Sequence, residues 1–324
     1  MNQTYFLGAN SKAGFASLYA GFPPEPGQLL HILKGGPGTG KSGFMRRIGR
    51  AAEARGLAVH TVLCSGDPDS LDGLWIPALG QAWADGTAPH VLEPRSFGVD
   101  ADYVNLGVFF RGPFLEAEKA AAVQLSGRYK ALYAEAYRDL AASGALEEPE
   151  RAPDPGLLAQ AMALLPAEAA REGGASRESA RFLSALSCQG LLRLTGEIEK
   201  LCKLIVQVER AALPSLLEEI RQRGLAVIRC PSPLSPERPE ALLLPEASLA
   251  LVDESWDFPA AERLCAPARP AVEAPLRKDL LGLALEALRR GKALHDELEE
   301  LYKAHMDFPA LTAFTDAVIE SLFP

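Results

Sequence analysis

The chain contains the apolar segment Leu29-Leu30-His31-Ile32-Leu33, followed almost at once by Gly35-Gly36-Pro37-Gly38-Thr39-Gly40-Lys41-Ser42. The second segment is a complete G-x-x-x-x-G-K-[ST] motif, known as Walker A. Consecutive backbone N–H groups can wrap a polyphosphate only where side chains do not block the approach, and the four glycines meet this need. We expect a strand, a phosphate-binding loop and a helix over residues 43–56 whose N-terminus faces the phosphates.

The motif assigns a role to each part of the loop. Lys41 is expected to reach the β- and γ-phosphates and to act in catalysis, while the Ser42 hydroxyl is expected to ligate Mg²⁺. The predicted nucleotide-binding residues are Gly35, Gly36, Pro37, Gly38, Thr39, Gly40, Lys41, Ser42 and Gly43. The predicted ligands are therefore ATP and Mg²⁺; ATP is preferred to GTP because the chain has no N-K-x-D guanine-binding motif.

A second apolar run, residues 57–64, is predicted to be a buried parallel strand that ends in a polar loop. Ligands of open α/β sheets bind beyond the carboxyl ends of strands. Four polar side chains follow this strand: Ser65, Asp67, Asp69 and Asp72. We expect this loop near a second substrate or a hydrated metal, with Asp67 the first candidate to position a catalytic water; the alternative is a solvated turn.

A third segment, Ala82-Trp83-Ala84-Asp85, is typical of a Walker B strand, whose terminal aspartate holds the Mg²⁺ shell. Asp85 is therefore the predicted second metal ligand, although an ordinary aspartate at a strand end is the alternative. Gly86 occupies the place where many ATPases carry a catalytic glutamate. Its presence favours slow hydrolysis.

Composition limits the class of protein. The 324 residues are 48% hydrophobic and 23% charged, which suits a folded core of one or two domains. A net charge of −9 argues against general nucleic-acid binding. The five cysteines form no CxxC pair, and the chain has no signal peptide or apolar run of membrane-spanning length. We expect a cytoplasmic protein that does not bind membranes.

An internal repeat is visible. Residues 55–85 align without gaps with residues 223–253, and ten of the 31 positions are identical. Upstream, residues 6–14 resemble residues 182–190, but the offset is larger by eight residues, which is the length of the segment Gly35–Ser42. We expect two copies of one α/β module on a parallel sheet, of which the second has lost the phosphate loop.

The second copy nevertheless has a better Walker B segment, Leu249-Ala250-Leu251-Val252-Asp253-Glu254. Where its phosphate loop should follow the predicted strand 204–208, the chain reads Glu209-Arg210-Ala211-Ala212-Leu213-Pro214, with no glycine, lysine or hydroxyl group. Asp253 and Glu254 are therefore expected to be structural unless the two modules face one another.

Three strings carry a family resemblance: HILKGGPGTGKS, CSGDPDSLDG and IPALGQAWADGTAPH. The chain resembles bacterial P-loop ATP-binding proteins with two tandem P-loop modules, of ATPase or nucleotide-kinase type. The resemblance covers most of residues 3–145 and, more faintly, residues 180–322. The chain departs from the family because it lacks the second Walker A motif. The resemblance implies a nucleotide-binding α/β fold and makes Thr87 and His90 candidate polar contacts.

The remaining segments are predicted to be helical arms and a linker. A helix over residues 114–143 carries an apolar stripe with three tyrosines, interpreted as core or as a surface for packing against a partner helix. Arg111 before it is a candidate lid arginine or a solvated charge. The expected organisation is a P-loop module (1–112), a helical arm (113–145), a linker (146–178), a degenerate module (179–275) and a C-terminal helical arm (276–324), amphipathic over residues 280–305.

Three functions are compatible with these features. The first is Mg²⁺-dependent ATP binding with slow hydrolysis coupled to movement of the arms or of the second module. The second is a small-molecule or nucleotide kinase, with Asp67, Asp69 or Asp72 binding the acceptor hydroxyl. The third is a non-catalytic nucleotide sensor. The sequence identifies no acceptor, protein partner or oligomeric state.

Overall fold

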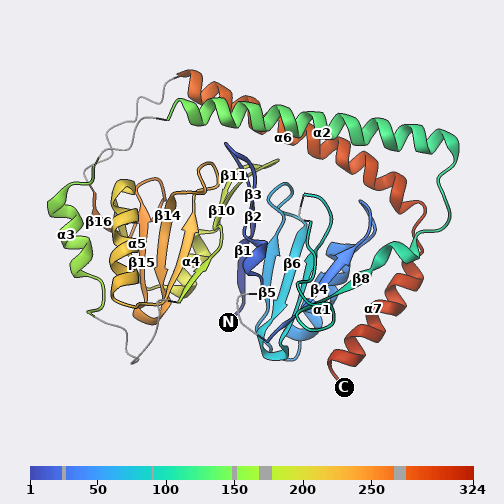
Figure 1. Cartoon of the computed structure of the whole chain (residues 1–324), viewed down its shortest axis with the longest axis horizontal. Coiled ribbons are helices and arrows are strands. Elements are labelled where there is room, and N and C mark those ends of the chain that lie inside the picture. Colours follow the sequence, from blue (N-terminus) through green and yellow to red (C-terminus); the bar gives the residue numbers. More distant parts are fainter. Residues whose placement is uncertain (24–26, 90, 148–151, 168–176, 266–274) are drawn as a thin grey trace.

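The computed structural model describes residues 1–23, 27–89, 91–147, 152–167, 177–265 and 275–324. Two α/β units lie side by side beneath a pair of long helices (Figure 1). The first unit is blue and cyan, and the second is yellow and orange. The α/β class predicted from the sequence is confirmed.

The first unit contains a six-stranded sheet. In spatial order its strands are β1 (Gln3–Phe6), β5 (His60–Leu63), β6 (Leu71–Ile76), β7 (Gln81–Asp85), β4 (Leu29–Lys34) and β8 (Ala101–Asn105). β1 is parallel to β5, and β4 is parallel to β7 and β8, but β6 is antiparallel to both of its neighbours. The prediction of a parallel sheet is wrong in this respect. Short connections join β5 to β6 and β6 to β7, and a parallel pair would need a longer crossover.

The second unit repeats this topology. Its strands, in the equivalent order, are β9 (Glu178–Ala180), β13 (Val227–Pro231), β14 (Pro239–Leu244), β15 (Leu249–Asp253), β12 (Leu204–Val208) and β16 (Glu262–Leu264). Each pair has the same relative direction as its counterpart in the first sheet. A helix follows the fifth strand of this order in both units: α1 (Lys41–Glu53) after β4 and α5 (Leu213–Gln222) after β12. A further short helix, α4 (Thr195–Leu201), precedes β12.

The two units contact each other through reciprocal hydrogen bonds. Phe6 N donates to Phe182 O and Phe182 N donates to Phe6 O, both at 2.9 Å. These two phenylalanines occupy equivalent positions of the sequence repeat. Each unit also has one β-hairpin next to this bridge, β2 (Gly8–Ser11) with β3 (Gly14–Ser17) and β10 (Ser184–Ser187) with β11 (Gly190–Arg193). The two units are therefore related by approximate two-fold symmetry at this bridge.

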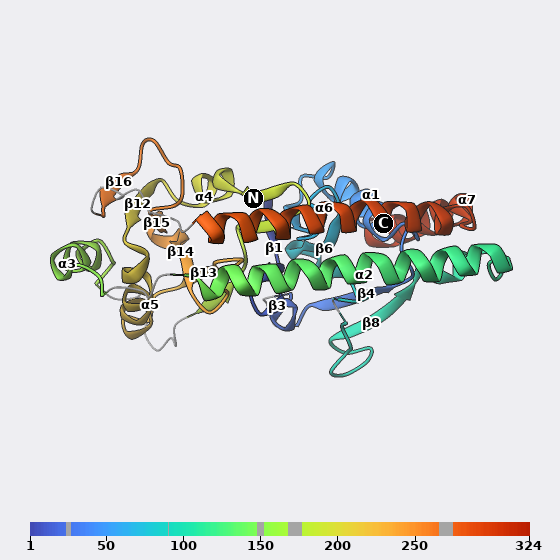
Figure 2. The same ribbon diagram turned by 90° about the horizontal axis from the view of Figure 1, so that it is seen from above.

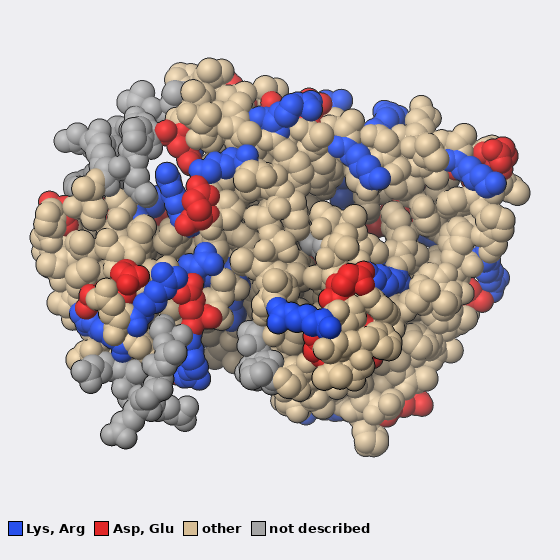
Figure 3. All heavy atoms as spheres, viewed as in Figure 1, with Lys and Arg blue, Asp and Glu red and all other residues tan. Residues whose placement is uncertain are grey.

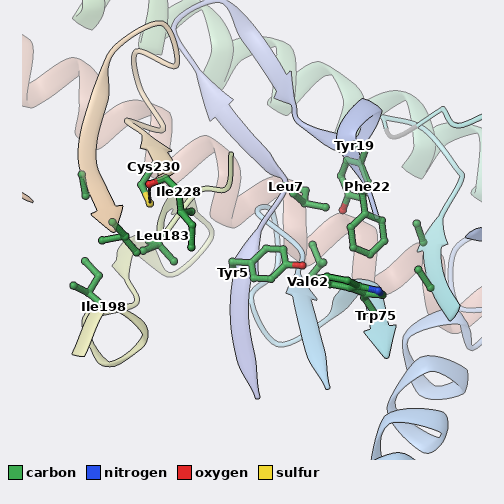
Figure 4. Close-up of a cluster of buried hydrophobic side chains, with 14 of the residues drawn as sticks. Tyr5, Leu7, Tyr19, Phe22, Val62, Trp75, Leu183, Ile198, Ile228 and Cys230 are labelled. Atoms are coloured by element: carbon green, nitrogen blue, oxygen red, sulfur yellow. Dashed lines mark hydrogen bonds between the residues drawn. The ribbon is translucent and has the colours of Figure 1, made fainter. Parts of the chain in front are cut away.

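A buried apolar cluster connects the two sheets. It includes Tyr5, Val62 and Trp75 from the first unit and Leu183 and Ile228 from the second (Figure 4). The opposite face of the first sheet packs on α1, and the opposite face of the second packs on α5. The cluster shared by both sheets removes apolar surface of both units from water, so we expect the units to be stable mainly as a pair.

Two long antiparallel helices, α2 (Glu116–Ala145) and α6 (Pro275–Lys303), cross both units and lie against each other along the long axis of the molecule (Figure 2). The end of α2 meets the start of α6, where Ser143 Oγ donates to Arg277 O at 3.4 Å. At the other end His305, just past α6, lies 3.1 Å from Glu118. Gly291 gives the two helices close contact, because a β-carbon there would lie 3.0 Å from the Tyr133 ring.

Each long helix leads the chain toward the other unit. After α2 the chain forms α3 (Pro155–Ala163), which packs on α5 of the second unit. After α6 it forms α7 (Phe308–Leu322), which packs on α1 of the first unit (Figure 1). The C-terminal helix therefore belongs to the core of the N-terminal unit. The predicted helical arm over residues 276–324 is thus two helices, and Asp307 with Pro309 is the signal for the start of the second.

The surface carries charges of both signs. Figure 3 shows Lys and Arg side chains interspersed with Asp and Glu on the face that it presents. Among the residues that the structure describes, no helix combines the length and the apolar character needed to cross a membrane.

Candidate functional site

Residues 35–40 form the connection from β4 to α1, and Lys41 and Ser42 are the first residues of α1, which therefore starts two residues before the predicted helix. Gly38 and Gly40 have φ of 66° and 87°, a left-handed backbone conformation that residues with a β-carbon rarely adopt. Thr39 Oγ1 donates to Gly36 O at 2.8 Å, which closes the loop on itself. The first N–H groups of a helix have no partner within it, so a loop that leads directly into α1 offers several backbone donors close together.

Lys41 and Asp85 meet beside this loop. Lys41 Nζ donates to the carbonyl oxygens of Gly35 and Gly36, at 3.0 and 2.9 Å, and lies 3.6 Å from Asp85 Oδ2. Asp85 ends β7, where the sheet register pairs it with the last part of β4. Its second oxygen, Oδ1, accepts from Thr87 N at 2.8 Å and from Thr87 Oγ1 at 2.6 Å. Two distant parts of the sequence thus place a cation and an oriented carboxylate together.

Ser42 supplies a hydroxyl group at the same place. Its Oγ accepts from Leu71 N at 3.0 Å, which ties α1 to the start of β6. Hydroxyl and carboxylate oxygens suit Mg²⁺, which keeps several waters and is completed by phosphate oxygens. The residues therefore fit a Mg²⁺–phosphate complex better than a metal held by protein alone. The described part of the chain has no group of three or more His, Cys, Asp or Glu side chains placed to hold a metal.

The acidic loop after β5 divides its side chains between different partners. Asp67 Oδ2 accepts from Ser70 Oγ at 2.9 Å and lies 3.3 Å from Lys292 Nζ of α6. Asp69 accepts from Gln189 Nε2 of the second unit at 3.0 Å. Asp67 and Asp72 line the same cavity as the phosphate loop, whereas Asp69 does not. Of the three predicted acceptor contacts, two are brought to the site.

The cavity has a volume of about 830 Å³, within the usual range for small-molecule sites. One wall is the loop with Asp85 and Thr87, and the opposite wall comes from the long helices. The helix residues that line it include Tyr129, Lys130, Tyr133, Tyr137, Lys292, His295, Glu299, Tyr302 and Lys303. Sequence analysis interpreted the tyrosine stripe of α2 only as a helix-packing surface. The structure corrects this, because the same tyrosines also face the cavity.

The loop is in close contact with α6. A β-carbon on Gly36 would lie 2.8 Å from the ring of Tyr302, and one on Gly38 would lie 2.6 Å from Glu299 O. These two glycines are thus needed both for backbone access and for the approach of a helix that is distant in sequence. This contact could not be predicted from the motif, since it depends on the tertiary path of α6.

The charges around the cavity are balanced. Burial lowers the pKa of Lys292, but Asp296 and Asp67 outweigh this effect and raise it, so Lys292 is a stable cation. Burial holds the pKa of His295 below its usual value, against the opposing effect of Glu299. Burial also raises the pKa of the Cys64 thiol, with Asp72 contributing in the same direction. The cations facing the cavity are therefore lysines, and they share it with four acidic residues, Asp67, Asp72, Asp85 and Glu299.

Some predicted candidates lie elsewhere. Arg111 is mostly exposed and pairs with Asp307, so the lid-arginine interpretation has no support from its position. Asp253 is buried in the second unit and accepts from Arg210 Nε at 2.8 Å. Glu254 accepts from Arg210 N at 2.8 Å. Neither acid lines the cavity. His90 lies outside the described residues.

Comparisons with family models, with curated proteins and with solved structures found no match to this chain.

Proposed function

We propose that the protein is a P-loop nucleoside-triphosphate-binding protein that binds Mg²⁺–ATP in its first unit and hydrolyses it slowly. The observation that carries the proposal is the convergence of the glycine loop, Lys41, Ser42 and Asp85 on one cavity. A loop without these side chains would be an ordinary turn. The combination instead offers backbone donors, a mobile cation and two oxygen ligands to a single polyphosphate.

The residues would divide the work as follows. Backbone N–H groups of Gly38–Gly43 hold phosphate oxygens, and Lys41 exchanges its two loop carbonyls for phosphate oxygens. Ser42 and Asp85 bind the Mg²⁺ shell, with Thr87 keeping the Asp85 carboxylate oriented. When bound, Mg²⁺ neutralises charge that develops on the phosphates. Asp67 remains the candidate for positioning water, held by Ser70 and Lys292.

Slow turnover is supported by the surroundings of Gly86. A β-carbon at this position would lie 2.2 Å from Ile32 Cγ2 and 3.3 Å from Leu33 O. A glutamate therefore cannot be accommodated after Asp85 without a shift of β4. We infer that the first unit does not use a base at this position.

Coupling to the rest of the molecule is supported by the contact of α6 with the loop. Gly36 and Gly38 touch the last turns of a helix whose first turns lie over the second unit. Any movement of the loop during binding or hydrolysis would therefore displace α6. The displacement would reach the second unit through the other end of this helix.

We further propose that the two units arose by duplication and that the second lost nucleotide binding. Support comes from the identical strand order and from the reciprocal Phe6–Phe182 bridge. In the second unit Arg210 takes the place of a loop lysine beside the strand-end aspartate Asp253. All five cysteines, which lie within the described residues, have free thiols, and this supports a reducing, cytoplasmic location.

A kinase is the second candidate, and one observation favours it. The cavity extends beyond the phosphate loop to Asn10, Cys64 and Asp72, which is space that a bare hydrolase does not need. In this case Asp72 would contact the acceptor hydroxyl. Release of ADP that depends on an added acceptor would distinguish a kinase from a hydrolase.

The direct test is thermal unfolding with Mg²⁺ and ATP, ADP, GTP or a non-hydrolysable ATP analogue, for wild type and Lys41→Ala. A ligand at one hundred times its dissociation constant should raise the free energy of unfolding by about 2.7 kcal/mol, which raises Tm by a few degrees. We expect this rise in wild type and its loss in the variant. No rise with any nucleotide would contradict the proposal, and binding without turnover would favour the sensor.

A further inference from the structure

The C-terminal helix α7 begins at the phosphate loop with an aromatic ring. Phe308 is the first residue of α7 and lines the cavity. Its Cε1 atom lies 3.8 Å from the position that a β-carbon on Gly40 would occupy. The side chain is 39% exposed, although the helix that carries it is packed in the core of the first unit. An apolar ring thus remains accessible directly beside the loop.

The ring is held in place by its neighbours. Asp307 caps α7 by accepting from Ala310 N at 3.1 Å, and its own N–H donates to Phe109 O at 2.8 Å. The next turn is buried, because Leu311 packs on Gly40. These contacts fix the helix start relative to the loop, so the ring of Phe308 has a defined position.

Several glycines of the loop are covered by neighbouring side chains. Tyr302 covers Gly36, Glu299 with Lys303 covers Gly38, and Leu311 covers Gly40. Gly43, at the start of α1, is exposed and lines the cavity, and a β-carbon there would meet nothing within 4 Å. At Gly43 a polyphosphate held by the loop has room to extend its nucleoside into the cavity that Phe308 also lines.

From this arrangement we propose that Phe308 binds the base of the nucleoside triphosphate by stacking. The proposal rests on nucleotide binding by the first unit and adds the part of the site that recognises the nucleoside. Aromatic rings stack on any base because every base has a π-face. Phe308 should therefore contribute affinity for nucleosides in general and little discrimination between adenine and guanine.

The proposal also gives the C-terminal helix a function. The residue that completes the nucleotide site lies after the second unit in the sequence and reaches the first through α6. Binding of the base would then add a direct contact between the nucleotide and α7.

The test compares ATP with inorganic tripolyphosphate, which has no base. Affinities with Mg²⁺ are measured by calorimetry for wild type, Phe308→Ala, Phe308→Tyr and Lys41→Ala. We expect Phe308→Ala to weaken the affinity for ATP about tenfold, equivalent to about 1.4 kcal/mol, and to leave the affinity for tripolyphosphate unchanged. Phe308→Tyr should retain ATP affinity because it keeps the ring.

Phe314→Ala is the matched control. Phe314 is on the same helix and 37% exposed, but it stacks on Phe44 and does not line the cavity. This variant reports loss of α7 packing alone and should leave the ratio of ATP to tripolyphosphate affinity unchanged.

Two results would overturn the inference and leave the proposed function intact. One is equal weakening of ATP and tripolyphosphate by Phe308→Ala, which would mean that the ring only packs. The other is unchanged ATP affinity in that variant while Lys41→Ala abolishes binding. If wild type binds neither ligand, nucleotide binding itself fails and the inference fails with it.

Discussion

The two units share one topology and differ at the carboxyl ends of the equivalent strands β4 and β12. In the first, a loop with four glycines leads into α1, and Lys41 lies 3.6 Å from Asp85. In the second, Arg210 hydrogen-bonds Asp253 at 2.8 Å, and Ser255 donates to this aspartate as Thr87 donates to Asp85. The comparison shows that the carboxylate and its hydroxyl partner are kept while the cation changes. Arg210 is held to its aspartate by a short charged hydrogen bond, whereas Lys41 is farther from its aspartate and donates to two loop carbonyl oxygens that phosphate oxygens could replace.

The largest difference in stability between the two units is expected when the residue after the strand-end aspartate is exchanged. Gly86→Glu places a β-carbon 2.2 Å from Ile32 Cγ2, so we expect a loss of about 3 kcal/mol in unfolding free energy, at the upper end for overpacking. Urea denaturation measures it. The reverse change, Glu254→Gly, is at an exposed position and should cost much less. Equal costs would mean that the two strand ends are not sterically different.

The next effect is expected at the cation. Arg210→Ala leaves the carboxylate of Asp253, which is 1% exposed, without its charged partner. Loss of one partner of a buried pair costs about 3–5 kcal/mol, and because Arg210 itself is 38% exposed we expect roughly 2–3 kcal/mol. Lys41→Ala should cost less, since the side chain of Asp85 is 15% exposed and lies 3.6 Å from Lys41, whereas Asp253 is nearly fully buried and accepts from Arg210 at 2.8 Å. Denaturant midpoints for the two variants test this. A larger cost for Lys41→Ala would mean that Lys41, and not Arg210, is the cation that stabilises the fold.

A smaller, pH-dependent effect concerns Glu240, which accepts from Ser184 and is buried beside Arg210 and Asp253. Burial raises the pKa of Glu240 to about 8. The folded state therefore holds a proton that the unfolded state releases near pH 4.5. The stabilising contribution is fully present below that pH and is lost as pH rises toward 8, with a slope of at most about 1.4 kcal/mol per pH unit.

Glu240→Gln removes this dependence. Between pH 5 and 8 the variant should show a flatter profile of unfolding free energy than wild type, because glutamine can keep the contact with Ser184 without titrating. Parallel profiles for the two proteins would show that Glu240 is ionised in the folded state.

The local part of this site could be predicted from the sequence because its chemistry is local. Glycine spacing, Lys41 and Ser42 lie within eight residues, and strand order brings Asp85 beside them. Asp85 was predictable only as a strand-end acid, and its distance from Lys41 depends on the sheet. The repeat was also visible, since two modules of equal topology keep apolar residues at equal spacing.

The remaining part depends on tertiary structure. No pattern along α6 shows that Glu299 and Tyr302 will touch the loop, because helix periodicity gives a face but not its partner. The antiparallel direction of β6 is, by contrast, implied in the sequence by the short connections on either side of the strand. The start of α7 was also present in the sequence, as Asp307 followed by Phe308 and Pro309.

The central claim is that one unit binds nucleotide and the other does not. The most direct measurement is the stoichiometry of Mg²⁺–ATP binding by calorimetry on wild type, Lys41→Ala and Asp253→Asn. We predict one ATP per chain in wild type and in Asp253→Asn, and no binding in Lys41→Ala. Two ATP molecules per chain, or binding that is lost in Asp253→Asn and kept in Lys41→Ala, would contradict the account.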